Sequence, residues 1–289
     1  MMIDLYTIDG AVNIDKNKCF DTEKTYPKFQ EDLEEFKNLL IQLVENKDCK
    51  TFYKFGDGDY YFLKKIPTGS ARPGNRALSK SYDQINHKDY VDGVGKCDYY
   101  TCEIYPENRI KFVEVISNKI DFPAEYGYAL IANKWFFDTF KGNIGLIGAK
   151  TKMEMIENLM ESSQYQEYLH LDKFEDYIGL PQKFACDDLN ETERIVGEQL
   201  KNSTSKIFLM GMGHVKSGLI HRLKKYTDAV FLDVGSGIDA IAGVIDIERP
   251  YFGDWTNYQI DGDELYNKVD TLGYYGKGKH IILERFNEV

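Results

Sequence analysis

Short apolar runs that alternate with helix-forming segments dominate the second half of this chain. The runs at residues 143–147, 206–210 and 229–234 are each followed by a glycine, after which the chain takes up helical spacing. Strands that alternate with helices in this way are typical of a parallel sheet whose two faces are covered. We therefore predict an α/β fold, with a Rossmann-like, mostly parallel sheet and helices on both faces of a single main domain.

Apolar periodicity and turn residues extend this prediction to the rest of the chain. The helix predicted at 106–119 is expected to bury Ile110, Val113 and Ile116. We expect an irregular segment at 1–28, the main domain at 29–260 and an extension at 261–289 packed on it. Predicted strands are at 3–8, 52–55, 97–105, 128–132 and 184–186, predicted helices at 29–45, 77–94, 106–119, 133–140, 152–160 and 191–200, and predicted turns or caps at Gly179, Pro181 and Asn190.

Composition excludes several classes of protein. The 289 residues are 43% hydrophobic, with 21 Tyr and 17 Phe, which is ample for a globular core. A net charge of -11 disfavours a nucleic-acid-binding face, because such faces cluster Lys and Arg. Five irregularly spaced cysteines form no disulfide framework, and no segment approaches the about 18 apolar residues of a membrane span. We expect a cytoplasmic protein that neither spans a membrane nor binds nucleic acid.

An acidic pair follows the first aromatic strand of the main domain. Asp57 and Asp59 lie on either side of Gly58, where both carboxylates can face one small volume, and Gly56 lets a ligand approach the backbone. Such a pair at a strand end suits a divalent cation that carries phosphates. The same residues are typical of a solvated Asp-Gly turn, so both interpretations stay open at this point.

Two arginines come soon after the acidic pair, in a loop rich in proline and glycine. The guanidinium groups of Arg72 and Arg76 are candidates to clamp a diphosphate, because their fork of donors matches phosphate oxygens. Arginines exposed on a surface loop are an equally good interpretation.

A second glycine-rich segment begins directly after a predicted strand. Gly211, Gly213 and Gly218 allow a tight turn into a helix, whose first amides are expected to point at an anion such as a diphosphate. His214 is a candidate for phosphate contact or proton transfer and Lys216 for phosphate contact, and structural roles remain open for both. The segment is not a P-loop, and its spacing departs from the dinucleotide fingerprint.

Residues 230–243 raise an alternative function. The apolar run, Asp233 and the following Gly-Ser-Gly resemble the first motif of S-adenosylmethionine-dependent methyltransferases. Against this, Asp239 replaces the third glycine, and only about 50 residues follow Gly237, too few for the remaining strands of that sheet. A methyltransferase is therefore the second hypothesis.

Four segments in order along the chain carry a family resemblance. They are YKFGDGDYYF from residue 53, YALIANKWFF from residue 128, FACDDLNETERIVGEQL from residue 184 and IFLMGMGHVKSGLIHRLKKYTDAVFLDVGSGIDAI from residue 207. The chain resembles the GT-D-type glycosyltransferases, first recognised as a bacterial domain of unknown function, over about residues 50–250. The resemblance implies transfer of a sugar from a nucleoside diphosphate donor, UDP-sugar above all, in a single GT-D-like domain.

The resemblance also implies a set of site residues. Asp57 and Asp59 would hold Mn2+ or Mg2+ with the donor diphosphate, and Gly56 and Asp233 would lie at the donor together with the glycine loop. The chain departs from the family's Arg-Phe-Gly-Asp-Gly-Glu signature, since Lys54 replaces the arginine and Asp59 the glutamate. The segment after the central strand also lacks the family's Ser-Arg and glycine pattern.

The acceptor side has only candidate residues. A direct displacement needs a base near the acceptor hydroxyl, and Asp188 and Asp239 are the favoured carboxylates, with His214 as a further candidate for proton transfer. The aromatic segment at 249–258 is a candidate acceptor lip or a packed loop. We expect a glycan or glycosylated-protein acceptor and consider a homodimer. A non-catalytic nucleotide-sugar-binding protein is the third hypothesis.

Overall fold

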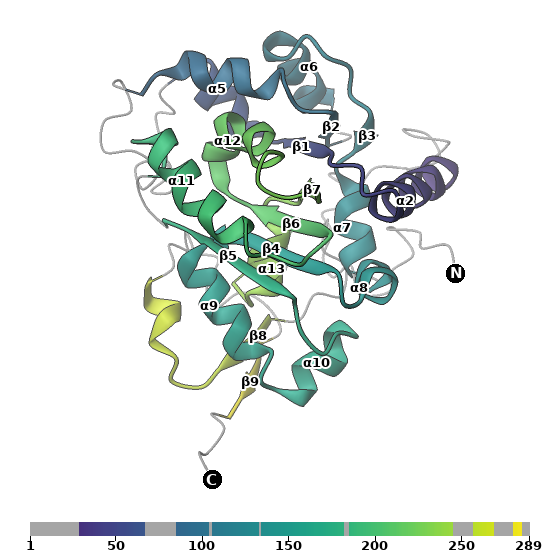
Figure 1. Cartoon of the computed structure of the whole chain (residues 1–289), viewed down its shortest axis with the longest axis vertical. Coiled ribbons are helices and arrows are strands. Elements are labelled where there is room, and N and C mark those ends of the chain that lie inside the picture. Colours follow the sequence, from purple (N-terminus) through teal and green to yellow (C-terminus); the bar gives the residue numbers. More distant parts are fainter. Residues whose placement is uncertain are drawn as a thin grey trace.

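The computed structural model describes residues 29–66, 85–103, 106–132, 134–181, 185–244, 257–268 and 280–284. These residues form a seven-stranded sheet with the strand order β3-β2-β1-β7-β6-β4-β5 (Figure 1). Every ladder in this sheet is parallel. The strands are β1 (Thr51–Phe55), β2 (Tyr99–Cys102), β3 (Phe122–Pro123), β4 (Ile144–Ala149), β5 (Asp176–Leu180), β6 (Ile207–Gly211) and β7 (Val230–Asp233). The predicted parallel α/β fold is confirmed.

Helices cover both faces of the sheet, as the alternating side chains of the strands require. Phe52 packs into one core cluster, whereas its neighbours Tyr53 and Phe55 pack into the other. The first cluster includes residues of α2 (Phe29–Glu45), α7 (Glu125–Ala132), α8 (Trp135–Phe140), α9 (Lys150–Leu159), α10 (Ser163–Leu169) and α13 (Gly237–Ile241). The second includes residues of α3 (Asp57–Leu63), α5 (His87–Val94), α6 (Pro106–Val115), α11 (Leu189–Leu200) and α12 (Lys216–Leu223).

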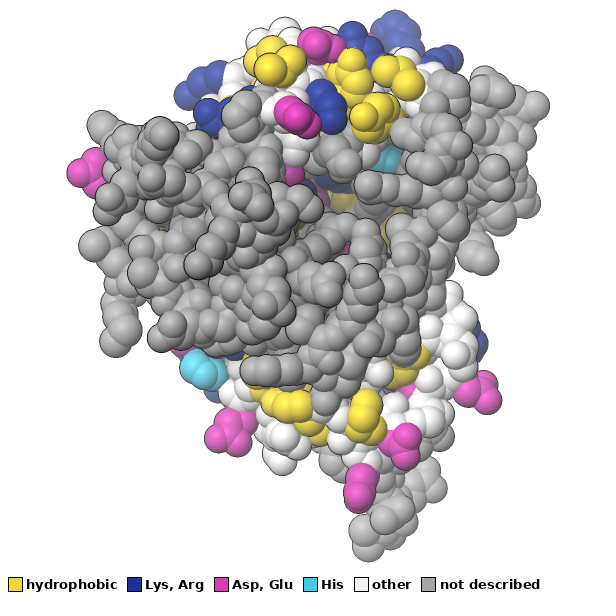
Figure 2. All heavy atoms as spheres, turned by 180° about the vertical axis from the view of Figure 1, so that it is seen from behind, with side chains coloured by type: hydrophobic (Ala, Val, Ile, Leu, Met, Phe, Trp, Pro, Cys, Tyr) yellow, Lys and Arg dark blue, Asp and Glu magenta, His cyan; other side chains and the backbone are white. Residues whose placement is uncertain are grey.

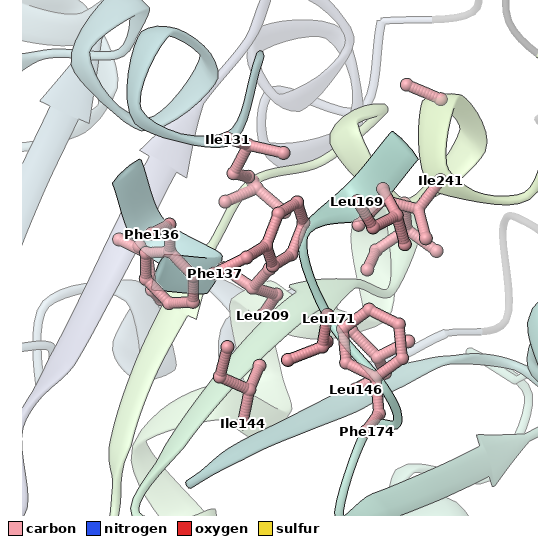
Figure 3. Packing of buried hydrophobic residues seen from close by; sticks show 14 of the residues in the cluster. Ile131, Phe136, Phe137, Ile144, Leu146, Leu169, Leu171, Phe174, Leu209 and Ile241 are labelled. Carbon is pink, nitrogen blue, oxygen red and sulfur yellow. The ribbon is translucent and has the colours of Figure 1, made fainter. Parts of the chain in front are cut away.

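Aromatic side chains of α8 fill the first core cluster. Figure 3 shows Phe136 and Phe137 beside Ile144 of β4 and Leu209 of β6. The rings of Phe136 and Phe137 meet edge to face, with centroids 6.2 Å apart, a geometry that aromatic pairs favour. The compact aromatic helix predicted at 133–140 is thus confirmed as part of the core.

The C-terminal strands β8 (Asn257–Ile260) and β9 (His280–Leu283) pair in parallel. They pack on the face of the seven-stranded sheet that the first core cluster covers. Gly243 makes this close approach possible, because a Cβ there would lie 2.1 Å from the carbonyl oxygen of Tyr258. The Gln259 side chain donates a hydrogen bond to the Gly243 carbonyl at 3.1 Å. A short 3-10 helix, η4 (Glu264–Lys268), follows β8.

Four local predictions are wrong. Residues 128–132 belong to helix α7 and not to a strand, because a short run that is apolar on all sides has no period that separates the two. Residues 176–180 form strand β5 through Gly179, where a turn was predicted, and the expected strand at 184–186 is a turn at residues 185–187. Helix α11 begins at Leu189, capped by Asp188 and not by Asn190.

Helix α6 also differs from its predicted orientation. The side chains of Ile110 and Val113 are 59% and 67% exposed, whereas Phe112 and Ile116 are buried. The expected buried side therefore holds for Ile116 alone among the three predicted residues.

Some predictions concern residues outside the described part of the structure. They are the irregular segment 1–28 with its strand at 3–8, the loop that carries Arg72 and Arg76, and most of the aromatic segment at 249–258. Within the described residues, no helix combines the length and apolar character needed to cross a membrane.

Candidate functional site

The carboxyl ends of β1, β2, β6 and β7 lie together at one edge of the sheet. From β1 the chain runs outward to β2 and β3, whereas β7, the last strand of the sheet, lies on the other side of β1. In open parallel sheets, ligands bind outside the carboxyl ends of the strands where the strand order reverses. The loops after β1 and β7 are therefore the expected place for a site.

Asp59 follows strand β1 and belongs to a cluster of buried charges at this edge. The acidic pair opens helix α3 and does not form the predicted turn: Gly56 is the N-cap, and the Asp59 carboxylate accepts the Gly56 amide at 2.8 Å. A carboxylate at the third helical position that reaches back to the N-cap amide is half of a capping box. The side chain of Asp57 lies outside the described part of the structure.

Lys216, the first residue of α12, joins two carboxylates beneath this edge. Its Nζ lies 3.2 Å from Asp59 Oδ2 and 2.7 Å from Asp233 Oδ2, and it donates to the carbonyl of Lys54. The ring of Tyr53 completes its surroundings, with the centroid 4.7 Å from Nζ. Only 6% of Lys216 is exposed, so this ammonium is held inside the protein by anions, a carbonyl and a ring.

For Asp59 and Lys216, the attraction between opposite charges outweighs the effect of burial on their pKa values. Burial favours neutral forms, yet the Lys216 ammonium, together with His214, keeps the pKa of the Asp59 carboxyl well below its usual range. Burial likewise opposes the charge of Lys216, but the carboxylates of Asp233 and Asp59 raise the pKa of its ammonium. Both groups are therefore charged at neutral pH.

Asp233 ends strand β7 and ties it to β1. Its carboxylate accepts the Lys54 amide at 3.1 Å and the Gly235 amide at 3.0 Å. Gly235 has a φ of +50°, a backbone region that glycine enters without steric cost. This turn fixes Asp233 opposite Lys216.

Lys54 supplies a second buried cation, which faces the glycine turns. Its Nζ lies 3.5 Å from Glu103 Oε1 and 5.4 Å from the centroid of the Tyr128 ring. A Cβ at Gly56 would lie 3.6 Å from this Nζ, and a Cβ at Gly235 would lie 3.7 Å from it. Burial lowers the pKa of Lys54, but Tyr128 and Glu103 raise it well above its usual value.

Three residues of this cluster were not recognised in the sequence. Glu103 directly follows β2 and accepts Asn108 at 2.6 Å as well as Lys54; its place at a strand end was the available signal. Tyr53 and Tyr128 carry no such signal, because buried tyrosines are common in this chain.

His214 lies at the outer side of the cluster. Its Nδ1 is 3.3 Å from Asp59 Oδ1, and its ring stacks on Phe62 with centroids 4.8 Å apart. A Cβ at Gly58 would come within 3.0 Å of its Cε1 and 3.6 Å of its Nε2. The histidine is thus fixed through Nδ1 and one ring face.

The glycine loop forms the strand-to-helix turn that the sequence predicted. Gly211 ends β6, a 3-10 turn η2 (Gly213–Val215) follows, and α12 begins at Lys216. A Cβ at Gly211 would lie 2.6 Å from the Gly235 carbonyl, so the loops after β6 and β7 touch. Gly213 has a φ of +57°. The Lys216 side chain enters the buried cluster.

The other predicted site residues have separate surroundings. Asp188 caps α11 by accepting the Glu191 amide at 2.9 Å, on an exposed part of the chain. Asp239 lies on α13 and pairs with Lys152 of α9. Arg72 and Arg76 lie outside the described residues.

The side chains of this cluster can be compared with the ligands that the expected divalent cation requires. Asp59 already contacts an ammonium, an amide and an imidazole, whereas Mn2+ or Mg2+ requires free oxygen ligands. Among the described residues, no three His, Cys, Asp or Glu side chains are grouped to hold a metal. The described donors therefore do not fit direct coordination through Asp59, and a metal site stays a prediction that depends on Asp57.

Comparisons with known proteins give few matches. No family model and no curated protein matches the sequence. Among solved structures, the chain is similar to one described as a new glycosyltransferase (DUF1792) from Streptococcus sanguinis, with a TM-score of 0.47 and 11% identity over 86% of this chain and 97% of that one. It is also similar to a selenomethionine-substituted structure of domain of unknown function 1792, with a TM-score of 0.47 and 11% identity over 84% and 92% of the two chains.

Proposed function

We propose that this chain is a glycosyltransferase that moves a sugar from a nucleoside diphosphate donor, a UDP-sugar, to a hydroxyl group of a glycan or glycosylated protein. The observation that carries the proposal is the pair of lysine ammonium groups held beneath the glycine turns after β1 and β7. The sequence resemblance to GT-D-type glycosyltransferases supports the same reaction class.

Lys54 is the cation best placed to meet the donor. Because Gly56 and Gly235 carry no side chains, the backbone turns come close to this ammonium: a Cβ at either position would lie within 3.7 Å of its Nζ. Negative charge grows on the diphosphate as the sugar leaves, and a fixed cation at that place stabilises the transition state. The resembled family has an arginine at this position, so a positive charge is common to both.

Lys216 and Asp233 act as positioning residues in this proposal. Their ion pair fixes the turn after β7 against the carbonyl of Lys54. Asp59 does the same for His214, whose Nδ1 it contacts. His214 is the candidate for contact with phosphate or for proton transfer to or from the acceptor hydroxyl. A divalent cation, Mn2+ or Mg2+, would add positive charge at the diphosphate when held through Asp57.

A ligand screen on the whole protein tests the proposal. Thermal unfolding is measured with a panel of sugar nucleotides, each with manganese or with EDTA, and with S-adenosylmethionine. A ligand that binds the folded state raises the melting temperature. A rise with one or more sugar nucleotides is expected, and a rise with S-adenosylmethionine alone would overturn the proposal in favour of the methyltransferase.

A second measurement separates catalysis from binding. Release of the nucleoside diphosphate is followed over time with the sugar nucleotide that stabilises best. The variant Lys54→Met keeps the aliphatic stem but removes the charge, and we expect at least about a 100-fold loss of rate. Stabilisation without any release or transfer would indicate a non-catalytic nucleotide-sugar-binding protein.

A further inference from the structure

Helix α6 presents an apolar surface that the site does not use. Ile110 and Val113 lie three positions apart, hence on one side of the helix, and are 59% and 67% exposed. Ile66, three residues after the end of α3, is 39% exposed, and its amide donates to the Tyr61 carbonyl at 2.9 Å. We call the exposed side chains of Ile66, Ile110 and Val113 the α3–α6 patch.

The exposure of these side chains is fixed by the fold. The opposite side of α6 is anchored by Phe112, which is fully buried and meets the ring of Phe55 edge to face at 5.4 Å. Burying Ile110 and Val113 by rotating the helix would expose Phe112, so the helix keeps its orientation. The apolar face therefore points outward in the folded protein.

Two contacts hold α3 and α6 together as one surface. The Tyr60 hydroxyl donates to Glu114 at 2.8 Å. The Lys111 ammonium lies 5.3 Å from the centroid of the Tyr61 ring. These contacts hold α3 and α6 next to each other.

The α3–α6 patch is locally basic in an acidic protein. Residues 64–66 and helix α6 contain four Lys and Arg but two Glu, whereas the whole chain has a net charge of -11. Lys64 and Lys65 are exposed beside Ile66. Figure 2 shows hydrophobic side chains gathered among Lys and Arg, with some acidic side chains, at the end of the molecule that carries α5 and α6.

We propose that the α3–α6 patch docks on an anionic membrane surface. Aliphatic side chains that project between lysines can enter the boundary of headgroups and acyl chains while the ammonium groups stay with anionic headgroups. The cores of protein interfaces are instead depleted of Lys and enriched in aromatic and Arg anchors. The composition of this patch therefore favours a lipid surface.

Docking in this way would bring the candidate site close to the lipid surface. Helix α3 carries Asp59 in its first turn, and Ile66 comes three residues after its end, so the patch and the charged cluster adjoin the same short helix. Where the chain is a glycosyltransferase, its acceptor then lies at the membrane surface. The lipid contact itself does not depend on that function.

Vesicle co-sedimentation of the whole protein tests the inference. Vesicles of phosphatidylcholine alone are compared with vesicles that also contain phosphatidylglycerol, at low and high salt. We expect binding to the anionic vesicles that weakens with salt, because salt screens the attraction between the lysines and the anionic headgroups. Equal binding to both kinds of vesicle, or binding to neither, would overturn the proposal.

Two matched variants locate the contact. Ile110→Ser with Val113→Ser removes exposed apolar groups without touching the core, and we expect at least about a tenfold loss of binding. Ile282→Ser is the control, since Ile282 is 52% exposed on β9 at the opposite end of the molecule (Figure 1). Unchanged binding by the double variant refutes the assignment. Self-association that the double variant abolishes, without vesicle binding, would identify a protein interface instead.

Discussion

The imidazole of His214 lies flat against the ring of Phe62, with the two planes within 6° of parallel. Phe62 is three positions after Asp59 on α3, so both residues that hold the histidine come from one side of this helix. Gly58 lies next to the imidazole on the same helix. Helix α3 therefore sets the position of His214, which follows β6 and is 155 positions from Asp59 in the sequence.

Replacement of Gly58 by alanine tests this position. The added Cβ would lie 3.0 Å from His214 Cε1, so the imidazole has to shift by a few tenths of an ångström. We expect about a tenfold loss of transfer rate, since errors of 1 Å in position cost about 100-fold. The free energy of unfolding should change by less than about 1 kcal/mol, because alanine is favoured within a helix. Gly127→Ala, whose Cβ makes an ordinary contact 3.8 Å from Val234, is the control; equal rates in both variants would contradict the role of His214.

Removal of the Lys216 ammonium should be costly to stability. Lys216→Met leaves the carboxylates of Asp59 and Asp233 buried without their cation. Loss of one partner of a buried ion pair destabilises a protein by about 3–5 kcal/mol. Urea unfolding followed by circular dichroism measures the effect.

A second substitution checks its cause. Adding Asp233→Asn to Lys216→Met removes one of the unpaired charges, so part of the lost free energy should return. A double variant that is less stable by the full sum of the two single effects would show that the charges do not interact.

The sequence predicts the framework better than it predicts the site. Strands β1, β4, β6 and β7 are short apolar runs close to a glycine, and helix α2 has a clear apolar period; all were predicted near their observed positions. Helix α7 was missed because its apolar side chains surround the helix and leave no amphipathic period.

The buried charge cluster could be predicted only in part. Asp59, Asp233 and Lys216 were recognised from strand ends and a glycine loop, but not as partners of one another. The Lys216 ammonium reaches the carbonyl of a residue 162 positions away. Only the order of strands in the sheet brings such residues together, and a single sequence does not state that order.

Asp188 can be tested separately as a helix cap and as a base. Its carboxylate accepts the Glu191 amide at the start of α11. Asp188→Ala should therefore cost about 1 kcal/mol, whereas Asp188→Asn keeps a capping oxygen and should cost a few tenths. Chemical denaturation measures both. An asparagine variant that is stable but inactive would support the predicted role as a base, and one that is fully active would exclude it.

Because α5 packs closely against α12, we expect a larger side chain at Gly93 to destabilise the protein. A Cβ there would lie 2.4 Å from the Ser217 carbonyl oxygen and 3.0 Å from Gly218 Cα, so the helices have to move apart. Gly93→Ala should destabilise the protein by about 1–3 kcal/mol. Gly95→Ala is the control, because its Cβ would be 3.7 Å from the nearest atom and its φ is −60°. Equal midpoints of denaturation in the two variants would contradict the close packing.

His221 predicts how stability depends on pH. Burial, together with the positive charges of Lys96 and Arg222, lowers its pKa to about 4, against about 6.5 in an unfolded chain. The buried Nδ1 has no hydrogen-bond partner among the described residues. Between these two pKa values the unfolded state binds more protons than the folded state, so stability must fall as the pH is lowered.

Thermal unfolding between pH 7 and pH 5 measures this contribution. Since glutamine does not titrate in this range, His221→Gln should lose less stability than the unchanged protein as the pH falls. His170→Gln is the control, because the His170 side chain is 53% exposed and pairs with Asp138 at the surface. If the glutamine variant at position 221 loses as much stability as the unchanged protein, protonation of His221 does not govern this decline.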